Sequence, residues 1–154
     1  MSENELEIRE AGPGDTEQVT QFSLACARDS ENLELDRNTV RAGVENALKD
    51  PTRARYFLAE KNGTPVGQIM LTREWSDWRN TWIWWLQSVY VNPDARGSGV
   101  FAAIYAHIEK LAREAGAASI RLYVDKGNAA AERAYLKAGF AMDHYNQMAR
   151  QLDR

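Results

Sequence analysis

Apolar positions recur along the first third of the chain with the periods of one short strand and two helices. A strand is expected at Leu6–Arg9. A helix should follow the turn "AGPGD" and run to about Arg28, because Asp15 can accept hydrogen bonds from the first free amides of a helix. A second helical pattern ends before Pro51, since the residue before a proline disfavours helical conformation.

The middle of the chain has the alternation of an antiparallel sheet. The segments "YFLAE" and "VGQIMLT" flank "KNGTP", in which Asn62 and Gly63 can adopt the positive φ angles of a two-residue hairpin turn. The next segment, "REWSDWRN", is expected to be a loop. The segment "TWIWWLQSVYV" is apolar at nearly every position, which predicts a central strand covered on both faces.

Helices and strands alternate in the last third. After a loop with two glycines, apolar residues recur at helical spacing until Gly116, a typical helix terminator. The segment "SIRLYV" predicts a strand, and "NAAAERAYLKAG" predicts a helix capped by Asn128 and ended by Gly139. Phe140–Leu152 should add one or two strands. The complete order predicts an α/β fold with a mixed sheet.

Composition narrows the class of protein. With 154 residues, 44% of them hydrophobic, the chain can build one core and is too short for two ordinary domains, so a single domain over residues 1–154 is expected. A net charge of -3 argues against a nucleic-acid partner, which would require a concentrated basic face. Cys26 is the single cysteine, so neither an internal disulfide nor a paired-cysteine zinc site can form. The N-terminal residues lack the pattern of a secretion signal and no stretch is long enough to span a membrane, so a cytoplasmic protein is expected.

The loop before the long helix has the residues of an anion site. Four backbone amides at a helix start would have no carbonyl partner, and the helix dipole adds partial positive charge. Glycines let an anion approach this backbone closely, and Arg96 and the Ser98 hydroxyl could add contacts to a diphosphate. The four amides belong to Gly97, Ser98, Gly99 and Val100. A merely flexible turn is the alternative interpretation.

Neither of two common nucleotide-binding patterns accounts for this loop. The letters "GSGVFA" satisfy the dinucleotide fingerprint G-x-G-x-x-A, and the next strand leads to Asp125, where a ribose-binding acid would lie. However, "NPDAR" makes the loop too long, and too little chain follows for the further βαβ units of that fold. The ATPase loop is excluded because no Gly-Lys-Ser/Thr sequence occurs.

Two segments resemble the GCN5-related N-acetyltransferase (GNAT) family. The segment "VYVNPDARGSGVFAAI" resembles its Arg/Gln-x-x-Gly-x-Gly/Ala loop, and "NAAAERAYLKAGF" resembles its Asn-x-x-Ala-x-x-x-Tyr-x-x-x-Gly-Phe helix, in the expected order. The matching residues are Arg96, Gly99, Asn128, Ala131, Tyr135, Gly139 and Phe140. The resemblance implies the acyl-CoA N-acyltransferase fold, with a mixed sheet of six or seven strands and about four helices. Phe101 departs from the loop pattern, and its ring either crowds the diphosphate or turns into the core.

The resemblance also implies a cosubstrate and a general acid. Family members use acetyl-CoA, with the diphosphate on the glycine loop and the pantetheine arm paired like an extra strand with the strand before it; no metal is implied. Tyr135 corresponds to the general acid that protonates the departing thiolate, with simple packing as the alternative. The implied acetyl-CoA-binding residues are Val89, Tyr90, Val91, Arg96, Gly97, Ser98, Gly99, Val100, Phe101, Ala102, Asn128 and Ala131.

The general base stays open at the level of sequence. Gln87 lies on the central strand where some polyamine-acetylating relatives carry Glu, and an amide cannot take a proton at pH 7. Glu74 and Asp77 are candidates to bind the amine or to orient a water molecule. Three carboxylates between the first two helices are further candidates, namely Glu31, Glu34 and Asp36.

All five tryptophans lie within the segment "WSDWRNTWIWW". Trp75 and Trp78 are expected to wall a pocket for a cationic substrate through cation–π contacts. The other three lie in the central strand, where core packing or a dimer contact is favoured. His107 and His144 lack the spacing of metal ligands, so each is expected to be structural.

These observations predict an acetyl-CoA-dependent N-acetyltransferase that acts directly on the primary amine of a small molecule. Cys26 has no evident histidine partner, so an acyl-enzyme is not expected. A non-catalytic CoA-binding regulatory module is the alternative. The expected partners are acetyl-CoA and a small amine, with a homodimer left open.

Overall fold

Strand-forming and helix-forming segments assemble into one mixed sheet with helices on both faces. The computed structural model describes residues 5–153. Among these residues the strands are β1 (Leu6–Glu10), β2 (Arg55–Lys61), β3 (Thr64–Ser76), β4 (Thr81–Val91) and β5 (Ser119–Leu122). The helices longer than one turn are α1 (Thr16–Glu31), α2 (Arg37–Leu48), α3 (Val100–Glu114) and α4 (Ala129–Lys137).

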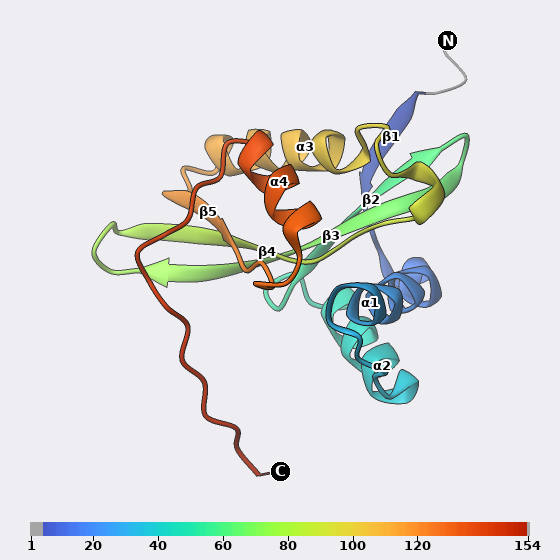
Figure 1. Cartoon of the computed structure of the whole chain (residues 1–154), viewed down its shortest axis with the longest axis horizontal. Helices are drawn as coiled ribbons and strands as arrows, with labels where there is room; N and C mark the ends of the chain where they lie inside the picture. The colour runs from blue at the N-terminus through green and yellow to red at the C-terminus, as the bar shows by residue number, and fades with distance from the viewer. Residues whose placement is uncertain (1–4, 154) are drawn as a thin grey trace.

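The sheet has the order β1-β2-β3-β4-β5. The first four strands run antiparallel to their neighbours, and β5 joins β4 in parallel. Asn62 and Gly63 have φ angles of 53° and 80°, which confirms the hairpin turn between β2 and β3. In Figure 1 the turn between β3 and β4 lies at one end of the sheet, and the loop from β4 to α3 lies toward the other end.

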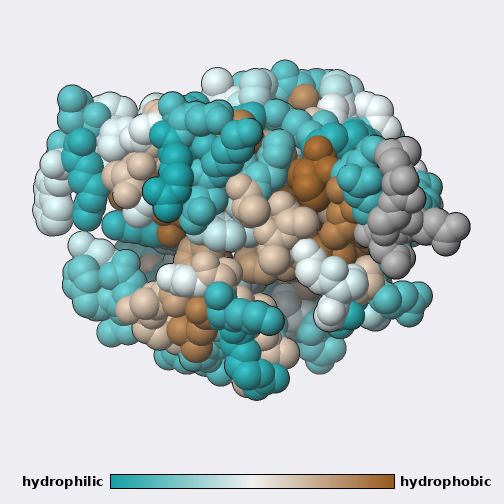
Figure 2. All heavy atoms as spheres, turned by 90° about the horizontal axis from the view of Figure 1, so that it is seen from above, coloured by the Kyte–Doolittle hydropathy of each residue, from teal (hydrophilic) through white to brown (hydrophobic). Residues whose placement is uncertain are grey.

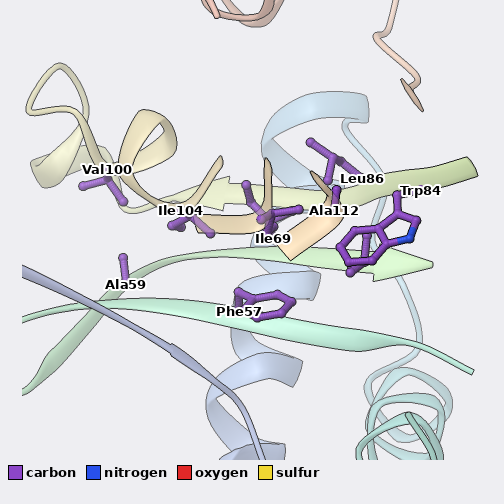
Figure 3. Packing of buried hydrophobic residues seen from close by; sticks show 10 residues of the cluster. Phe57, Ala59, Ile69, Trp84, Leu86, Val100, Ile104 and Ala112 are labelled. Carbon is purple, nitrogen blue, oxygen red and sulfur yellow. The ribbon is translucent and has the colours of Figure 1, made fainter. Parts of the chain in front are cut away.

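The apolar side of α3 covers one face of the sheet. Its buried residues recur every four positions, as a helix packed on a sheet requires. Figure 3 shows these side chains pointing toward large apolar residues of β2, β3 and β4. The residues at the centre of this core are Phe57, Ile69, Trp84, Leu86, Val100, Ile104 and Ala112. Trp84 is thus a core residue, as the sequence predicted, whereas Trp82 is 37% exposed and Trp85 is half-buried.

The opposite face is covered only in part. Helices α1 and α2 pack through Phe22 and Val44 on Tyr56 and Leu58, below the sheet in Figure 1. The neighbouring part of β4 and β5 carries no helix on this face, and Gln87 is exposed there. The expected covering of the central strand on both faces therefore holds only in part, because no helix of the described residues lies over this region and Glu74 and Gln87 are exposed on it. Figure 2 looks onto the other side of the molecule, the side of α3, where mostly polar residues are visible with some apolar residues between them.

The predicted α/β fold and its mixed sheet are confirmed, but two predicted segments differ. The expected loop "REWSDWRN" is wrong in its first half, because β3 continues through Ser76. The reason is cross-strand pairing: Trp75 lies opposite Trp82, and their rings meet edge to face at 5.1 Å. The strands expected in Phe140–Leu152 are absent from the described residues, which hold five strands rather than six or seven. No helix in the described range has the length and apolar character needed to cross a membrane.

Candidate active site

The site is built where β4 and β5 separate. Their pairing ends at Leu86 and Leu122, whereas β4 continues to Val91. Beyond Leu86, the edge of β4 on the β5 side has no strand partner in the described structure. Such an edge offers backbone donors and acceptors to an extended ligand. The predicted strand residues Val89, Tyr90 and Val91 lie in this separated segment.

A bulge in β4 marks the point of separation. Gln68 pairs with Tyr90 while Met70 pairs with Gln87, so β4 holds one extra residue. Ser88 lies in the bulge with a φ of +46°, a conformation uncommon outside glycine, asparagine and aspartate. The bulge re-aims the backbone of β4 away from β5. An N–H on this edge could stabilise negative charge on a thioester oxygen.

The buried side chain of Gln68, on β3, hydrogen-bonds to the backbone of this bulge. No pattern in the sequence pointed to this residue. Its side chain is fully buried, and its Nε2 donates to the Ser88 carbonyl at 3.1 Å and to Ser23 Oγ of α1 at 3.2 Å. Its Oε1 atom is buried without a hydrogen-bond partner in the described structure. A buried polar atom of this kind costs stability, which indicates that the residue serves the bulge rather than the core.

Replacing Gln68 with leucine is expected to separate activity from stability. The variant loses two hydrogen bonds but also removes the buried Oε1 atom, so the free energy of unfolding should change by no more than about 2 kcal/mol. The Ser88 bulge loses its support, and kcat should fall about tenfold or more. Steady-state kinetics and thermal unfolding test this. Ser23→Ala is the control, because it leaves the Gln68–Ser88 hydrogen bond intact and should keep the parental kcat.

The glycine loop has the backbone geometry of an anion site. Gly97 and Gly99 both have φ angles of +83°, which a residue with a side chain rarely adopts. The first hydrogen bond of α3 runs from the Ala103 N–H to the Gly99 carbonyl, at 3.0 Å. The amides of Val100, Phe101 and Ala102 therefore precede the helical ladder and lack partners within it. No side chain of Asp or Glu lies in the first turn of α3, so its positive end is not neutralised there.

Arg96 and Ser98 turn back onto the protein in this structure. The Arg96 Nε atom donates to the Val91 carbonyl at 3.0 Å, and its guanidinium lies 3.3 Å from Asp29. The Ser98 hydroxyl donates to the Ala95 carbonyl. Both side chains thus stabilise the path of the loop, and both remain exposed.

Helix α4 brings Tyr135 to the separated strands. Asn128 caps the helix by accepting from the Ala131 N–H at 3.1 Å, as the sequence predicted. The Tyr135 ring meets Phe101 edge-on at 5.4 Å. Phe101 has turned toward α4 and the core, the second of its two predicted orientations. Burial, with a smaller effect of nearby Cys26, raises the pKa of Tyr135 to about 12, so its hydroxyl stays protonated at neutral pH.

Cys26 also lies near Val89 and Tyr135, although it is distant in sequence from the glycine loop and from α4. Its Sγ atom donates to the Val89 carbonyl at 3.3 Å, and its charge would affect Tyr135. Burial raises the pKa of the Cys26 thiol. A neutral buried thiol is a weak nucleophile. Only the packing of α1 against β4 brings the residue here, so no local sequence pattern could have revealed it.

The part of the sheet without a covering helix carries polar and aromatic side chains beside the separation point. Gln87 Nε2 donates to Thr72 Oγ1 at 2.7 Å. Further along the strands, Glu74 accepts from Trp85 Nε1 at 3.2 Å and lies 3.8 Å from Arg121. These side chains form a face with both charge signs. We refer to Thr72, Glu74, Trp85, Gln87 and Arg121 as the open face.

Three of the residues that were predicted to contact the substrate lie far from Gln87 in the structure. Trp75 lies near the end of β3, while Asp77 and Trp78 lie in the turn beyond it. Thr81, which pairs with Ser76, is six residues from Gln87, a separation of about 20 Å along a strand. Trp78 is 82% exposed and so makes no pocket in this structure.

The two histidines do not form a metal centre. His107 packs against the Phe57 ring at 5.6 Å, and exposed His144 contacts its neighbour Asp143. Within residues 5–153, no cluster of three or more His, Cys, Asp or Glu side chains has the arrangement to hold a metal ion.

The sheet opens between two parallel strands, and a glycine loop and the start of a helix lie beside the gap. This arrangement is typical of a class of N-acyltransferases. Comparison with known proteins agrees. The sequence model described as Acetyltransferase (GNAT) family matches residues 17–140, which is more than half of the chain. The chain therefore belongs to the GNAT acetyltransferase family, whose members transfer acetyl groups from acetyl-CoA to amines.

Individual relatives are similar over most of their length. An aminoalkylphosphonate N-acetyltransferase of Salmonella typhimurium is 33% identical over 139 residues, covering 90% of this chain and 87% of the relative. An uncharacterized N-acetyltransferase of Mycobacterium bovis is 33% identical over 126 residues, covering 79% and 77%. The crystal structure of a possible acetyltransferase from Clostridium difficile superposes with a TM-score of 0.90 at 33% identity, covering 97% of this chain and 99% of that one.

Proposed function

We propose that this enzyme transfers the acetyl group of acetyl-CoA directly to the primary amine of a small molecule. The observation that carries the proposal is the coincidence of three features at one place: the unpaired edge of β4, the free amides at the start of α3 and the Tyr135 hydroxyl. The first suits the amide-bearing arm of CoA, the second its diphosphate and the third its thiolate.

The cosubstrate is assigned to residues around the separated strands. The backbone of Val89–Val91 would pair with the pantetheine arm. The loop and first turn of α3, residues 96–102, would hold the diphosphate. Asn128 and Ala131 would border the arm from α4, since they form the capped start of that helix. The absence of side chains at Gly97 and Gly99 supports this assignment, because a Cβ at either φ of +83° would be strained.

Tyr135 is proposed as the general acid. A phenol with a pKa of about 12 is a weak acid, and transfer to an ordinary thiolate would be unfavourable. Burial also raises the pKa of the neighbouring Cys26 thiol, however, so a CoA thiolate released in the same surroundings would be more basic as well. Burial would thus raise the pKa of the CoA thiol as well as that of the Tyr135 hydroxyl, so proton transfer from Tyr135 to the CoA thiolate stays feasible.

The open face is proposed to receive the acceptor amine. Gln87 would orient the amine, and Glu74 would accept its proton through water, since direct contact would require the amine to lie far along β4. Arg121 adds a cation to this face, which would suit an amine that also bears an anionic group. The similarity to the aminoalkylphosphonate N-acetyltransferase supports testing such amines first. An enzyme of the cytoplasm, where acetyl-CoA and free thiols coexist, fits the single reduced cysteine.

Direct transfer predicts that Cys26 is dispensable for chemistry. Cys26→Ala removes the single thiol of the chain, which lies beside the separated strands, but leaves the β4 edge and Tyr135 in place. Because the buried thiol is neutral at pH 7, kcat should stay within about threefold of the parent. Rapid-quench kinetics with radiolabelled acetyl-CoA is the measurement. A loss of turnover together with an acetylated Cys26 in the parent enzyme would establish an acyl-enzyme route instead.

A further inference from the structure

Two backbone carbonyls on the unpaired edge of β4 are occupied by side chains in this structure. The Asn92 N–H donates to a carbonyl of β3 at 2.8 Å, so it points toward β3. Because paired and unpaired positions alternate along an antiparallel strand, the Val91 carbonyl points to the opposite edge. The Arg96 Nε atom donates to this carbonyl at 3.0 Å. The Cys26 thiol donates to the Val89 carbonyl, two residues earlier, at 3.3 Å.

Three contacts hold the Arg96 side chain over this edge. Besides the Val91 carbonyl, the guanidinium lies 3.3 Å from Asp29 of α1 and 5.8 Å from the centroid of the Tyr90 ring. The side chains of Arg96 and Asp29 are 51% and 44% exposed, and an ion pair this exposed is weak. The guanidinium is therefore held in place, but a stronger anion can release it.

This position of Arg96 conflicts with two parts of the proposed cosubstrate site. While its Nε atom donates to Val91, that carbonyl is engaged and does not receive an amide of the pantetheine arm. While its guanidinium pairs with Asp29, it is turned back onto α1 and away from a diphosphate at the start of α3. Guanidinium groups form stronger hydrogen bonds with phosphate oxygens than with a neutral carbonyl. A diphosphate would therefore draw Arg96 off Val91.

We propose that Arg96, positioned by Asp29, makes the enzyme selective for thioesters that carry a diphosphate. A complete CoA molecule supplies the anion that draws Arg96 away, and this movement frees the Val91 carbonyl for the arm of the same molecule. A thioester on a bare pantetheine arm lacks that anion and must compete with the guanidinium for Val91. The inference rests on the proposed function, because it takes CoA to lie along β4 and the α3 loop.

Affinities for CoA and for pantetheine test the selectivity in the full-length protein. Pantetheine has the arm and thiol of CoA but no charge. In Arg96→Met, CoA should bind about threefold or more weakly, because a charge-assisted hydrogen bond is lost. Pantetheine should bind about threefold or more tightly, because the Val91 carbonyl is free. Titration calorimetry measures CoA, and competition against CoA measures pantetheine.

The matched control removes an arginine that is also paired with a carboxylate but lies elsewhere. Arg113 pairs with Glu109 near the end of α3, about 20 Å along that helix from Val100. At this distance its charge is screened by physiological salt, so Arg113→Met should keep the parental affinity for both ligands.

Replacing Asp29 tests its positioning role. Asp29→Asn weakens the hold on Arg96 without removing the guanidinium, so pantetheine should bind about two- to threefold more tightly. The same substitution in the Arg96→Met background should leave pantetheine affinity unchanged, because no guanidinium remains to be held. A merely structural role of Asp29 would shift the affinity equally in both backgrounds.

The opposite responses of the two ligands decide the proposal. If pantetheine binds Arg96→Met no more tightly than the parent, Arg96 does not obstruct Val91, and the proposed selectivity is overturned. It is also overturned if CoA binds this variant as tightly as the parent. A parent that binds neither ligand would overturn the assignment of CoA to β4 together with this inference, so the two failures are distinguishable.

Discussion

Replacing Tyr135 with phenylalanine is expected to lower kcat by a factor on the order of 10² or more while acetyl-CoA binding stays at the parental level. The variant keeps the ring that packs edge-on against Phe101, so the position of α4 and the thermal midpoint should not change. It removes the one hydroxyl proposed to protonate the departing thiolate. Stopped-flow or steady-state turnover, with calorimetric titration of CoA, measures both effects.

A thioester with a more acidic thiol provides the control for Tyr135→Phe. Such a leaving group needs less proton assistance, so the ratio of parental to variant rates should shrink with the activated donor. Misplacement of the cosubstrate would slow both donors alike. If the variant turned over acetyl-CoA as fast as the parent, Tyr135 would be a packing residue, and water or another group would protonate the thiolate.

Replacing Gly99 with glutamate is expected to remove most of the affinity for CoA. Two effects combine: any side chain is strained at a φ of +83°, and the carboxylate repels the diphosphate at the positive end of α3. The charge alone should cost about 1.4–2.8 kcal/mol, which is ten- to hundredfold in Kd. Isothermal titration calorimetry with CoA is the measurement.

Gly99→Gln isolates the charge from the strain. Both variants carry a long side chain at the same backbone position, and no atom lies within 4 Å of a Cβ built there, so both should fold. The glutamate variant should bind CoA at least tenfold more weakly than the glutamine variant at low salt, and the difference should narrow as salt rises. Equal affinities for the two variants would mean that no diphosphate lies at the start of α3.

Local sequence signals predicted the parts of the site that depend on local backbone geometry. Asn62 and Gly63 specify a hairpin wherever strands flank them, and Asn128 can cap α4 without help from the rest of the fold. The glycine loop is similar, because the unpaired amides follow from the start of α3 alone. These features needed no knowledge of which strands are neighbours.

Features that depend on strand register could not be predicted in this way. The Ser88 bulge exists only in relation to β3, and Gln68 supports it from a different strand. Cys26 reaches Val89 because α1 packs across β4, 63 residues away in sequence. Asp77 and Trp78 were candidates to contact the amine because of their charge and aromatic ring, and the continued pairing of β3 with β4 places them at the end of the hairpin. The chain after α4 has strand-like sequence, yet a strand also requires an edge to pair with.

The most direct test of the proposed reaction is release of CoA from acetyl-CoA across a panel of primary amines, with the acetylated product identified by mass spectrometry. The panel should include aminoalkylphosphonates, polyamines, amino acids and aminoglycosides. We predict turnover of at least one small amine, with an acetyl group on its nitrogen and with turnover reduced by Tyr135→Phe. Tight CoA binding without turnover of any amine would contradict the enzyme assignment and favour a CoA-binding regulatory module.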